Sequence, residues 1–345
     1  MNILLTCAGR RNYIVEYFKT ELLDINDKVY AANSHEYSTA LNLADKGFLV
    51  PSIYSQSYID VLIKLCHQYH INAIIPLFDL ELPILSRSIE RLKNEGVTTI
   101  VSYPNVIDIC NDKWLTSRYL SEIGIRNPKT FIDLAKTFNA LSNSKITFPL
   151  ILKPRWGMGS IGIMEAKDEN ELMYCYSKLR EIIDKSYIRV ESQKDFEKCI
   201  LIQEKIIGQE YGLDVINNLQ GDYVVTFIKK KLAMRSGETD VAETVYENKL
   251  DNIGKLLGSK LGHIANLDVD VFLNDDGAFV LEMNPRIGGG YPFSHLAGVN
   301  LPKAIIAWLK GKEPDKSCFD IKYGVVGMKG IQPVILNRLN FSKII

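Results

Sequence analysis

The chain has 345 residues, of which 46% are hydrophobic and 24% charged, so it is long enough for two or three compact units and is not a disordered protein. Lys plus Arg and Asp plus Glu both number 41, and the densest basic run, 229–231, is too short to indicate a nucleic-acid or anionic-membrane partner. No apolar run reaches the roughly 20 residues of a membrane span, and polar residues 9–12 argue against a signal peptide. The six cysteines lack metal-ligand or CxxC spacing, which indicates reduced thiols and a cytoplasmic location.

The first 110 residues alternate apolar strands with amphipathic helices. The apolar run 2–8, which is followed by Gly9, predicts a buried parallel strand that ends in a turn. Further strands are predicted at 29–32, 73–77 and 99–101, and helices at 12–23, 58–69 and 84–93. This alternation is typical of a parallel sheet covered by helices, so an α/β, Rossmann-like domain is expected over 1–110.

The pattern changes after residue 110. A helix is predicted at 112–123, where Gly124 ends it, and strands are predicted at 149–154, 201–204, 211–215 and 223–230. The apolar runs 267–273 and 278–283 are joined by a turn rich in Asn, Asp and Gly, which predicts a hairpin. We therefore expect two α+β units, 111–200 and 201–328, and a tail, 329–345, that carries no recognisable motif.

The loop after residue 154 is suited to a phosphate. Gly157, Gly159 and Gly162 allow open backbone conformations that turn N–H groups towards an anion, and Lys153 supplies a cation at the end of the preceding strand. The loop lacks the GK[ST] of a P-loop and no strand–GxGxxG–helix unit surrounds it. Taken alone, it is equally consistent with a flexible surface hairpin.

The predicted hairpin carries a set of polar residues. Glu282 and Asn284 are two apart, so they face the same way on a strand, and Asp270 is expected to oppose them, with Asp268 as the alternative. Two carboxylates and an amide oxygen suit Mg²⁺, and Arg286 would neutralise phosphate charge beside the metal. A solvated acidic face is the competing interpretation, but Glu282 lies in an apolar run and carboxylates are rarely buried without a partner or a metal.

These elements, in this order, resemble the ATP-grasp superfamily, and most closely its carbamoyl-phosphate-synthase and biotin-carboxylase type. The resemblance rests on Lys113, Lys153 with its glycine loop, residues 203–210, Asp270 and Glu282-x-Asn284-Pro285-Arg286. It covers nearly the whole chain. The N-terminal unit resembles the pre-ATP-grasp domain through Gly9-Arg10-Arg11 and Asp79-Leu80-Glu81, and the rest implies two α+β lobes that clamp ATP.

The resemblance implies a role for each matched position. Two lysines would hold the α- and β-phosphates, Lys113 and Lys153. The loop would close over the phosphates as a lid, through Gly157, Gly159, Ser160 and Gly162. Glu204 would accept from the adenine amino group, and the other nucleotide contacts would be made by Lys205, Ile207 and Glu210. One or two Mg²⁺ ions, replaceable by Mn²⁺, would be coordinated by Asp270, Glu282 and Asn284. The acyl phosphate would be stabilised by Arg286, and the reacting phosphate approached by Arg235 or, as a weaker candidate, Lys231.

Several positions keep two interpretations. Asp79 and Glu81 are either acceptor ligands or caps of a helix N-terminus. Residues 288–290 and His295 follow Arg286, where relatives often build the acceptor pocket, although a structural role is the favoured interpretation of His295. His263 is expected to be structural.

The implied function is an ATP-dependent carboxylate–amine ligase, an enzyme that forms a carbon–nitrogen bond through an acyl phosphate and releases ADP and phosphate. Its partners would be a small-molecule carboxylate and amine, without nucleic acid or membrane, and a homodimer is an open alternative to a monomer. The rivals are a bicarbonate-activating, carbamoyl-phosphate-synthase-like enzyme and a non-catalytic ATP-binding module, which predicts damage at positions that are intact here.

Overall fold

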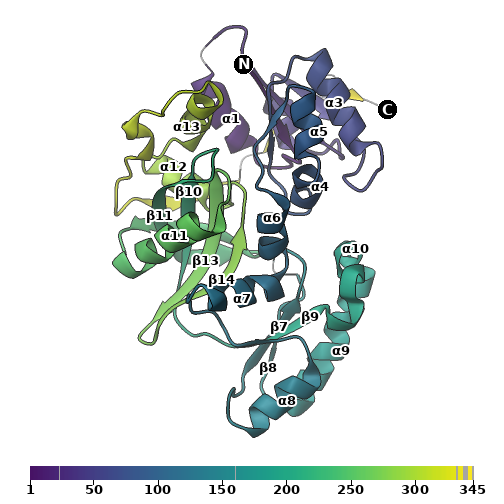
Figure 1. The fold of residues 1–345 in the computed structure, drawn as a ribbon, viewed down its shortest axis with the longest axis vertical. Helices are drawn as coiled ribbons and strands as arrows, with labels where there is room; N and C mark the ends of the chain where they lie inside the picture. Colours follow the sequence, from purple (N-terminus) through teal and green to yellow (C-terminus); the bar gives the residue numbers. More distant parts are fainter. Residues whose placement is uncertain (23, 160, 332, 337–340, 344–345) are drawn as a thin grey trace.

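The structure is a computed structural model that describes residues 1–345 except 23, 160, 332, 337–340 and 344–345, and of residues 341–343 it describes the backbone alone. Its strands form two six-stranded sheets and one four-stranded sheet. The four-stranded sheet and its helices lie at the opposite end of the molecule from the N-terminal domain (Figure 1). Among the described residues, no helix has the length and apolar character to cross a membrane.

The N-terminal sheet is parallel throughout, in the order β16-β3-β2-β1-β4-β5. Its central strands are almost wholly buried, as expected where helices cover both faces. The strands are β1 (Asn2–Thr6), β2 (Lys28–Asn33), β3 (Lys46–Leu49), β4 (Ala73–Pro76), β5 (Thr98–Thr99) and β16 (Phe341–Lys343). The helices are α1 (Asn12–Glu21), α2 (Thr39–Leu43), α3 (Tyr58–Gln68), α4 (Leu82–Ser86) and α5 (Ile89–Asn94).

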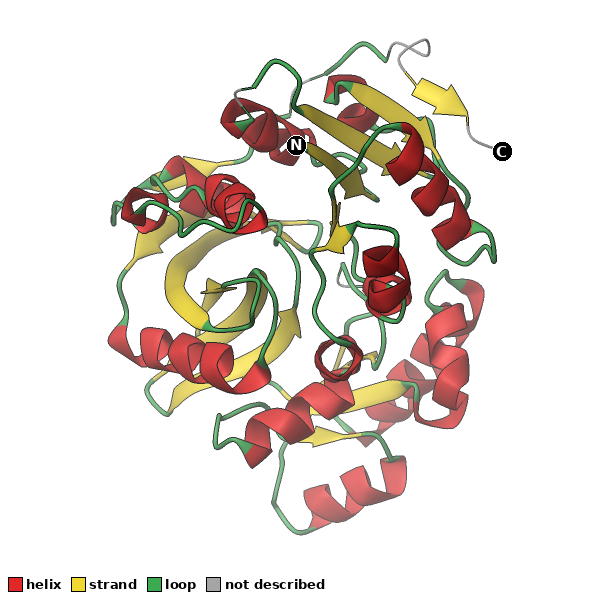
Figure 2. Ribbon diagram, turned by 45° about the horizontal axis from the view of Figure 1, so that its top comes forward, coloured by secondary structure: helices red, strands yellow, loops and turns green. Residues whose placement is uncertain are grey.

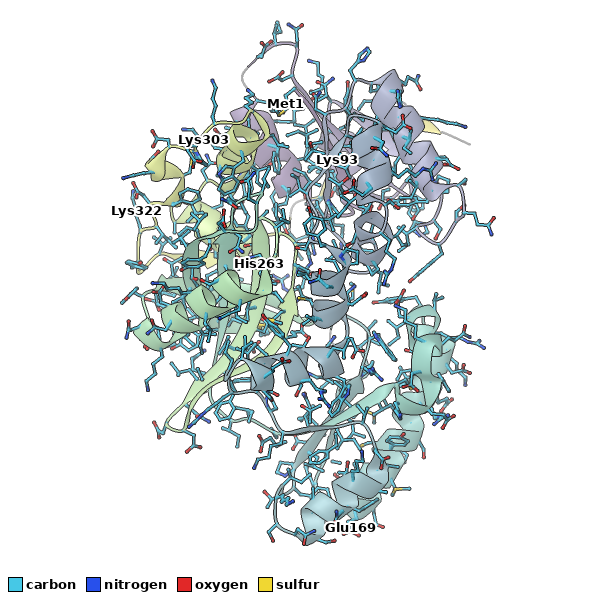
Figure 3. The ribbon with its side chains drawn as sticks, viewed as in Figure 1. Met1, Lys93, Glu169, His263, Lys303 and Lys322 are labelled. Carbon is cyan, nitrogen blue, oxygen red and sulfur yellow. The ribbon has the colours of Figure 1, made fainter. Side chains whose placement is uncertain are left out.

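The four-stranded sheet, which we call the small lobe together with its helices, is antiparallel in the order β6-β9-β7-β8. Its longest helix, α9, is capped by Asp168 and buries one apolar stripe that includes Leu172 and Leu179. Figure 3 places Glu169, the first residue of α9, at the far end of this lobe. The elements are β6 (Thr130–Phe131), α8 (Leu134–Ser142), β7 (Leu150–Pro154), β8 (Met164–Ala166), α9 (Glu169–Lys185), α10 (Arg189–Ser192), the 3₁₀ helix Gln193–Lys198 and β9 (Ile200–Glu204).

The second six-stranded sheet, the large lobe, is antiparallel in the order β14-β13-β10-β11-β12-β15 and is strongly curved in Figure 2. Its strands are β10 (Gln209–Asn217), β11 (Tyr223–Arg235), β12 (Glu238–Val245), β13 (Asn266–Asn274), β14 (Gly277–Asn284) and β15 (Val326–Met328). Its helices are α11 (Asn248–Leu261), α12 (Tyr291–Leu296), α13 (Leu301–Leu309) and the 3₁₀ helix Lys316–Phe319.

Two helices connect the N-terminal domain to the lobes, α6 (Pro104–Asn111) and α7 (Lys113–Glu122). Asp112 caps α7 by accepting hydrogen bonds from the backbone of Trp114 and Leu115. Both helices share a hydrophobic core with β13 and β14. Lys113, the first residue of α7, is therefore carried on the large sheet.

The predicted strands and helices are largely found, with differences that have local causes. The helix predicted at 84–93 is two helices, α4 and α5. At the break the Ser88 hydroxyl donates to Ile84 O (2.9 Å), so a side chain competes with the backbone there. The helix predicted at 12–23 ends at Glu21, and residue 23 lies outside the described residues. The tail, in which no motif was recognised, supplies strand β16 at the sheet edge.

His263 is a structural residue, as expected. It is fully buried, Nε2 bonds to Val215 O (3.0 Å), and burial lowers its pKa to about 4. An unfolded histidine titrates near 6.5, so between pH 6.5 and 4 the unfolded state gains a proton that the folded state does not. We expect this residue to remove about 3 kcal/mol of stability between pH 7 and pH 4. Urea unfolding at both pH values should show a smaller loss for His263→Gln, and an equal loss would contradict the assignment.

Candidate active site

A cavity of about 350 Å³ lies between the small lobe and the large lobe, and we call it the nucleotide cavity. Its walls include apolar side chains of both lobes, such as Ile151, Ile163 and Leu281. Its volume falls within the range of about 300–1,000 Å³ that is common for small-molecule sites. It brings together most of the predicted residues, namely Lys113, Lys153, Gly157, Gly159, Glu204, Lys205, Glu210, Asp270 and Glu282.

The two predicted phosphate-binding lysines reach this cavity from different elements. Lys113 extends from the first turn of α7, donates to Gly157 O in the glycine loop and lies 3.6 Å from Glu282. Lys153, at the end of β7, is buried, and its pKa is lowered to about 8. Burial is the main cause and the charge of Lys113 adds to it, while Glu282 and Asp270 oppose the shift. Two cations, of which Lys153 is buried, lie beside a loop of open backbone and form a site suited to an anion.

The lowered pKa of Lys153 predicts a pH dependence. Because the free protein loses this charge as the pH rises through about 8, we expect kcat/KM for ATP to fall above that pH. Bound phosphates would stabilise the ammonium, so kcat should fall less steeply at saturating ATP. In Lys153→Arg the fall in kcat/KM should move to higher pH, because a guanidinium stays protonated. An identical profile in the variant would assign the titration to another group.

The three predicted metal ligands lie side by side on the hairpin β13–β14. Asp270 is the cross-strand partner of Glu282, and Asp268 is the partner of Asn284, so the predicted opposition across the turn is confirmed. Asp268 also bonds Arg286 Nη1 (2.9 Å), whereas Asp270 faces both the nucleotide cavity and a second cavity beside it. Of the two candidates for the first ligand, Asp270 is therefore the better placed.

The charges on this hairpin suit a divalent cation. Burial raises the pKa of Asp270 to about 6, which Lys231 opposes and the neighbouring Asp268 and Glu282 reinforce. Burial also raises the pKa of Glu282, but three lysines outweigh it and the net shift is downward. Two close carboxylates and the amide oxygen of Asn284 are hard oxygen donors, so the residues present fit Mg²⁺.

Lys231 is held more tightly at the site than the sequence indicated. Its Nζ lies 2.6 Å from both Glu210 Oε1 and Asp270 Oδ1, and these two carboxylates outweigh burial and raise its pKa. The first lysine of the 229–231 run, Lys229, is almost fully buried and pairs with Asp214. The basic run, which is too short to indicate a nucleic-acid or membrane partner, thus supplies two cations to the interior of the sheet, because residues two apart share a face.

The second cavity, of about 150 Å³, adjoins the nucleotide cavity, and we call it the acceptor cavity. Met158, Gly159, Gly237, Asp270 and Glu282 line both cavities, so the candidate metal ligands lie at their junction. The remaining lining comes from the N-terminal domain, from β10–β14 and from the loop after β14, and it consists of Arg11, Asp79, Gly212, Lys229, Lys231, Glu238, Thr239, Asp268, Asn284, Arg286, Gly289 and Gly290.

Arg286 joins the N-terminal domain to the large lobe. Its Nη1 donates to Asp268 Oδ2 (2.9 Å), its Nη2 donates to Asp79 Oδ2 (3.0 Å), and its Nε lies 2.9 Å from Asp79 Oδ1. The interpretation of Asp79 and Glu81 as helix caps is wrong. Asp79 binds Arg286, and Glu81 makes no cap bond but accepts from the Tyr58 hydroxyl (2.6 Å) in the core.

Four predicted residues are not placed in either cavity by the described structure. Arg235 lies at the exposed end of β11 and pairs with Asp240, and Ile207 is 75% exposed. Gly162 has a φ of +68°, and a side chain there would collide with Leu179 of α9. Backbone conformation and packing therefore both favour glycine at this position. Ser160 lies outside the described residues. The possible acceptor contact His295 stacks on Tyr17 instead, at 3.6 Å between ring centroids.

Glu204 lies at the junction of the lobes and faces the nucleotide cavity. Its Oε1 accepts a hydrogen bond from Lys129 N (2.8 Å), and its backbone N–H donates to Lys129 O (3.1 Å). The carboxylate is therefore occupied in this structure, and its predicted contact with an adenine amino group stays a prediction.

Sequence reasoning did not predict that Arg11, Lys229 and Glu238 line the second cavity. Arg11 belongs to the motif Gly9-Arg10-Arg11, for which no role was predicted. Lys229 belongs to the basic run 229–231, which was considered only as a possible nucleic-acid or membrane contact. Alternation along β11 was the available signal for Lys229, because Lys231 was already a candidate and residues two apart share a face. For Glu238 the sequence offered no comparable signal.

Comparison with known proteins identifies the fold and the family. A family model for the PylC-like N-terminal domain matches residues 3–100, and one for the ATP-grasp domain matches residues 110–290. A D-alanine–D-alanine ligase of Campylobacter lari is 22% identical over 309 residues, which cover 84% of this chain and 82% of that protein.

Solved structures share the fold at lower identity. The biotin carboxylase domain of Hydrogenobacter thermophilus 2-oxoglutarate carboxylase, a dimer in complex with MgADP, ADP and bicarbonate, has a TM-score of 0.73 and 18% identity, over 94% of this chain and 73% of that one. The L-amino acid ligase of Bacillus licheniformis has a TM-score of 0.67 and 18% identity, over 88% and 74%.

The structure therefore combines an N-terminal parallel sheet with two antiparallel lobes that enclose lysines and a carboxylate pair. With the domain model matching more than half of its length, the chain belongs to the ATP-grasp family. The predicted family and fold are thereby confirmed. Membership of this family implies ATP and Mg²⁺.

Proposed function

We propose that this protein is an ATP-dependent carboxylate–amine ligase that forms an amide-like bond through an acyl phosphate. The observation that carries the proposal is the junction of the two cavities at Asp270 and Glu282. A nucleotide in the larger cavity would present its γ-phosphate at the carboxylate pair, and a small substrate in the acceptor cavity would meet it there.

The nucleotide cavity would hold ATP by contacts that match its chemistry. The apolar walls from Ile151, Ile163 and Leu281 would cover the flat base, and the Glu204–Ile207 segment would line its edge. Glu210, which lines the cavity and pairs with Lys231, would bind the ribose hydroxyls. Lys113 and Lys153 would bind the α- and β-phosphates as charge-assisted donors.

The reaction would proceed in two balanced steps. A substrate carboxylate oxygen attacks the γ-phosphorus, the bond to the β–γ bridging oxygen breaks, and ADP leaves. The amine nitrogen then attacks the acyl carbon, the carbon–oxygen bond to phosphate breaks, and phosphate leaves as the nitrogen loses a proton. Neither step needs a nucleophile from the protein, so the residues act by positioning the substrates and stabilising charge.

Each charged group has a place in that scheme. Arg286, buried beside the junction, would stabilise the negative charge of the forming acyl phosphate. Asp270, Glu282 and Asn284 would hold Mg²⁺, which when bound neutralises phosphate charge and orients the phosphates. The glycine loop, already linked to Lys113 through Gly157 O, would exclude water and protect the acyl phosphate from hydrolysis. Arg235 keeps a proposed catalytic role only if the β11–β12 turn moves towards the phosphates.

The proposal extends to the metal ion, the oligomeric state, the cellular location and the domain boundaries. Mn²⁺ should replace Mg²⁺ because it accepts the same oxygen donors. A homodimer is proposed by analogy with the dimeric biotin carboxylase domain of 2-oxoglutarate carboxylase. The described structure records all six cysteines as free thiols, which supports the proposed cytoplasmic location. The unit boundaries near residues 110, 200 and 328 stay predictions.

The direct test is an ADP-release assay with Mg-ATP against crossed panels of small carboxylates and amines. We expect turnover that requires one member of each panel. Turnover with bicarbonate and ammonia alone would favour the bicarbonate-activating alternative. If the protein binds ATP but no combination raises ADP release above background, it is a non-catalytic ATP-binding module and the ligase proposal fails.

A further inference from the structure

Arg11 is an arginine of the N-terminal domain that faces the acceptor cavity, which otherwise is built mainly from the large lobe. It follows β1 and occupies the N-cap position of α1. Its backbone N–H donates to Ala8 O (2.9 Å), and its backbone carbonyl accepts from Ile14 N (3.0 Å). Its Nη1 donates to Ile287 O (3.1 Å), next to Arg286. The side chain is thus fixed at the wall of the cavity.

The other cations that line the acceptor cavity are each neutralised by a carboxylate. Arg286 pairs with Asp79 and Asp268. Lys231 pairs with Glu210 and Asp270, and Lys229 pairs with Asp214. The cavity-lining carboxylates outside this set also have cationic partners, since Glu238 lies 3.2 Å from Lys329 and Glu282 lies 3.6 Å from Lys113.

Within the described ranges of the chain, Arg11 has no carboxylate at ion-pair distance, and its guanidinium makes one hydrogen bond to a carbonyl. Burial and the like charge of Arg286 lower its pKa, while Asp79 and Glu238 attract it only from a longer distance. A guanidinium carries five N–H donors in a planar fork. A partly buried cation that lines a cavity and leaves most of its donors unused favours an anion, and a carboxylate matches the fork with two oxygens.

We propose that Arg11 determines specificity by binding a second substrate carboxylate, one that is not phosphorylated. This inference rests on the proposed ligase function. The carboxylate would belong either to the amine substrate, which would then be an amino acid, or to the activated acid, which would then be a dicarboxylate. The acceptor cavity, at about 150 Å³, lies below the range of about 300–1,000 Å³ for drug-sized ligands, so the group that it holds is compact.

The experiment compares Arg11→Gln with Arg10→Gln in the full chain. Arg10 is the matched control because it is the adjacent arginine, is exposed and does not line the acceptor cavity. ADP release is measured with two sets of probes, L-amino acids against their α-amides as amines, and dicarboxylates against their mono-amides as acids. Whichever arm shows a preference for the extra carboxylate identifies the substrate that carries it.

We expect Arg11→Gln to lower kcat/KM about 10- to 100-fold for the carboxylate-bearing probe alone, because a charge-assisted hydrogen bond is lost. KM for ATP and the values for the amide probe should stay unchanged, and Arg10→Gln should match the wild type. Equal losses with both probes, a raised KM for ATP, or an unchanged preference would overturn the proposal.

A binding measurement separates this proposal from the ligase function. The same probes are added to the Mg-ADP-loaded protein and the shift in melting temperature is recorded. If turnover is absent but carboxylate-bearing probes stabilise the wild type and not Arg11→Gln, the ligase function fails while the carboxylate site stands. If no probe stabilises the wild type and none is preferred in turnover, the carboxylate site fails.

Discussion

Glu282→Gln should reduce turnover about 1,000-fold while the protein stays folded, a loss on the scale of removing one electrostatic group from a transition state. Glu282 faces Asp270 across the hairpin and lies 3.6 Å from Lys113. The amide has nearly the same shape, so packing is kept, but the metal site loses one of its two charges. The apparent Mg²⁺ concentration for half-maximal ADP release should rise.

The control for this variant is Asp275→Asn, which makes the same change of charge on the exposed turn of the same hairpin. It should keep wild-type turnover and the wild-type Mg²⁺ dependence. Unimpaired turnover in Glu282→Gln, with the Mg²⁺ titration unmoved, would remove Glu282 from the metal site.

Arg286→Ala should lower the free energy of unfolding by about 3–5 kcal/mol, because it leaves the buried carboxylate of Asp79 and the partly buried carboxylate of Asp268 without their partner. Arg286→Lys should recover part of this loss, since one ammonium cannot reproduce the three contacts of the guanidinium. Urea unfolding measures both changes. Turnover of Arg286→Lys, measured where that variant remains folded, reports the separate catalytic role.

The matched control is Arg235→Ala. Arg235 also pairs with a carboxylate, Asp240, but at the exposed end of β11, so its loss should change stability by less than about 1 kcal/mol. A destabilisation by Arg286→Ala no larger than that of Arg235→Ala would mean that the Asp79–Arg286–Asp268 bridge does not hold the N-terminal domain to the large lobe.

Local patterns in the sequence were enough for the fold class and the centre of the site. The hairpin that carries Asp270 and Glu282 was predictable because side chains alternate along strands and its turn residues set the register. The same reasoning applied to α9 would have found it, since Asp168 provides a cap and Leu172, Cys175, Leu179 and Ile183 follow at helical spacing. That helix was missed although its signal is present.

Contacts between distant parts of the chain were not predictable from such patterns. Asp79 and Arg286 lie 207 residues apart, and Arg11 reaches Ile287 over 276 residues. No spacing rule links such positions, because the parallel sheet and the large lobe fix their approach only after both have folded. Glu204 was predictable as a residue at the lobe junction, but the bond of its carboxylate to Lys129 depends on strand pairing with β6.

The central claim is that a substrate carboxylate is phosphorylated by ATP, and transfer of an oxygen isotope tests it most directly. With the carboxylate substrate identified by the ADP-release assay and labelled with ¹⁸O in its carboxyl group, one labelled oxygen should pass to each phosphate released together with ADP. Phosphate without the label, or AMP and pyrophosphate as products, would contradict an acyl-phosphate ligase.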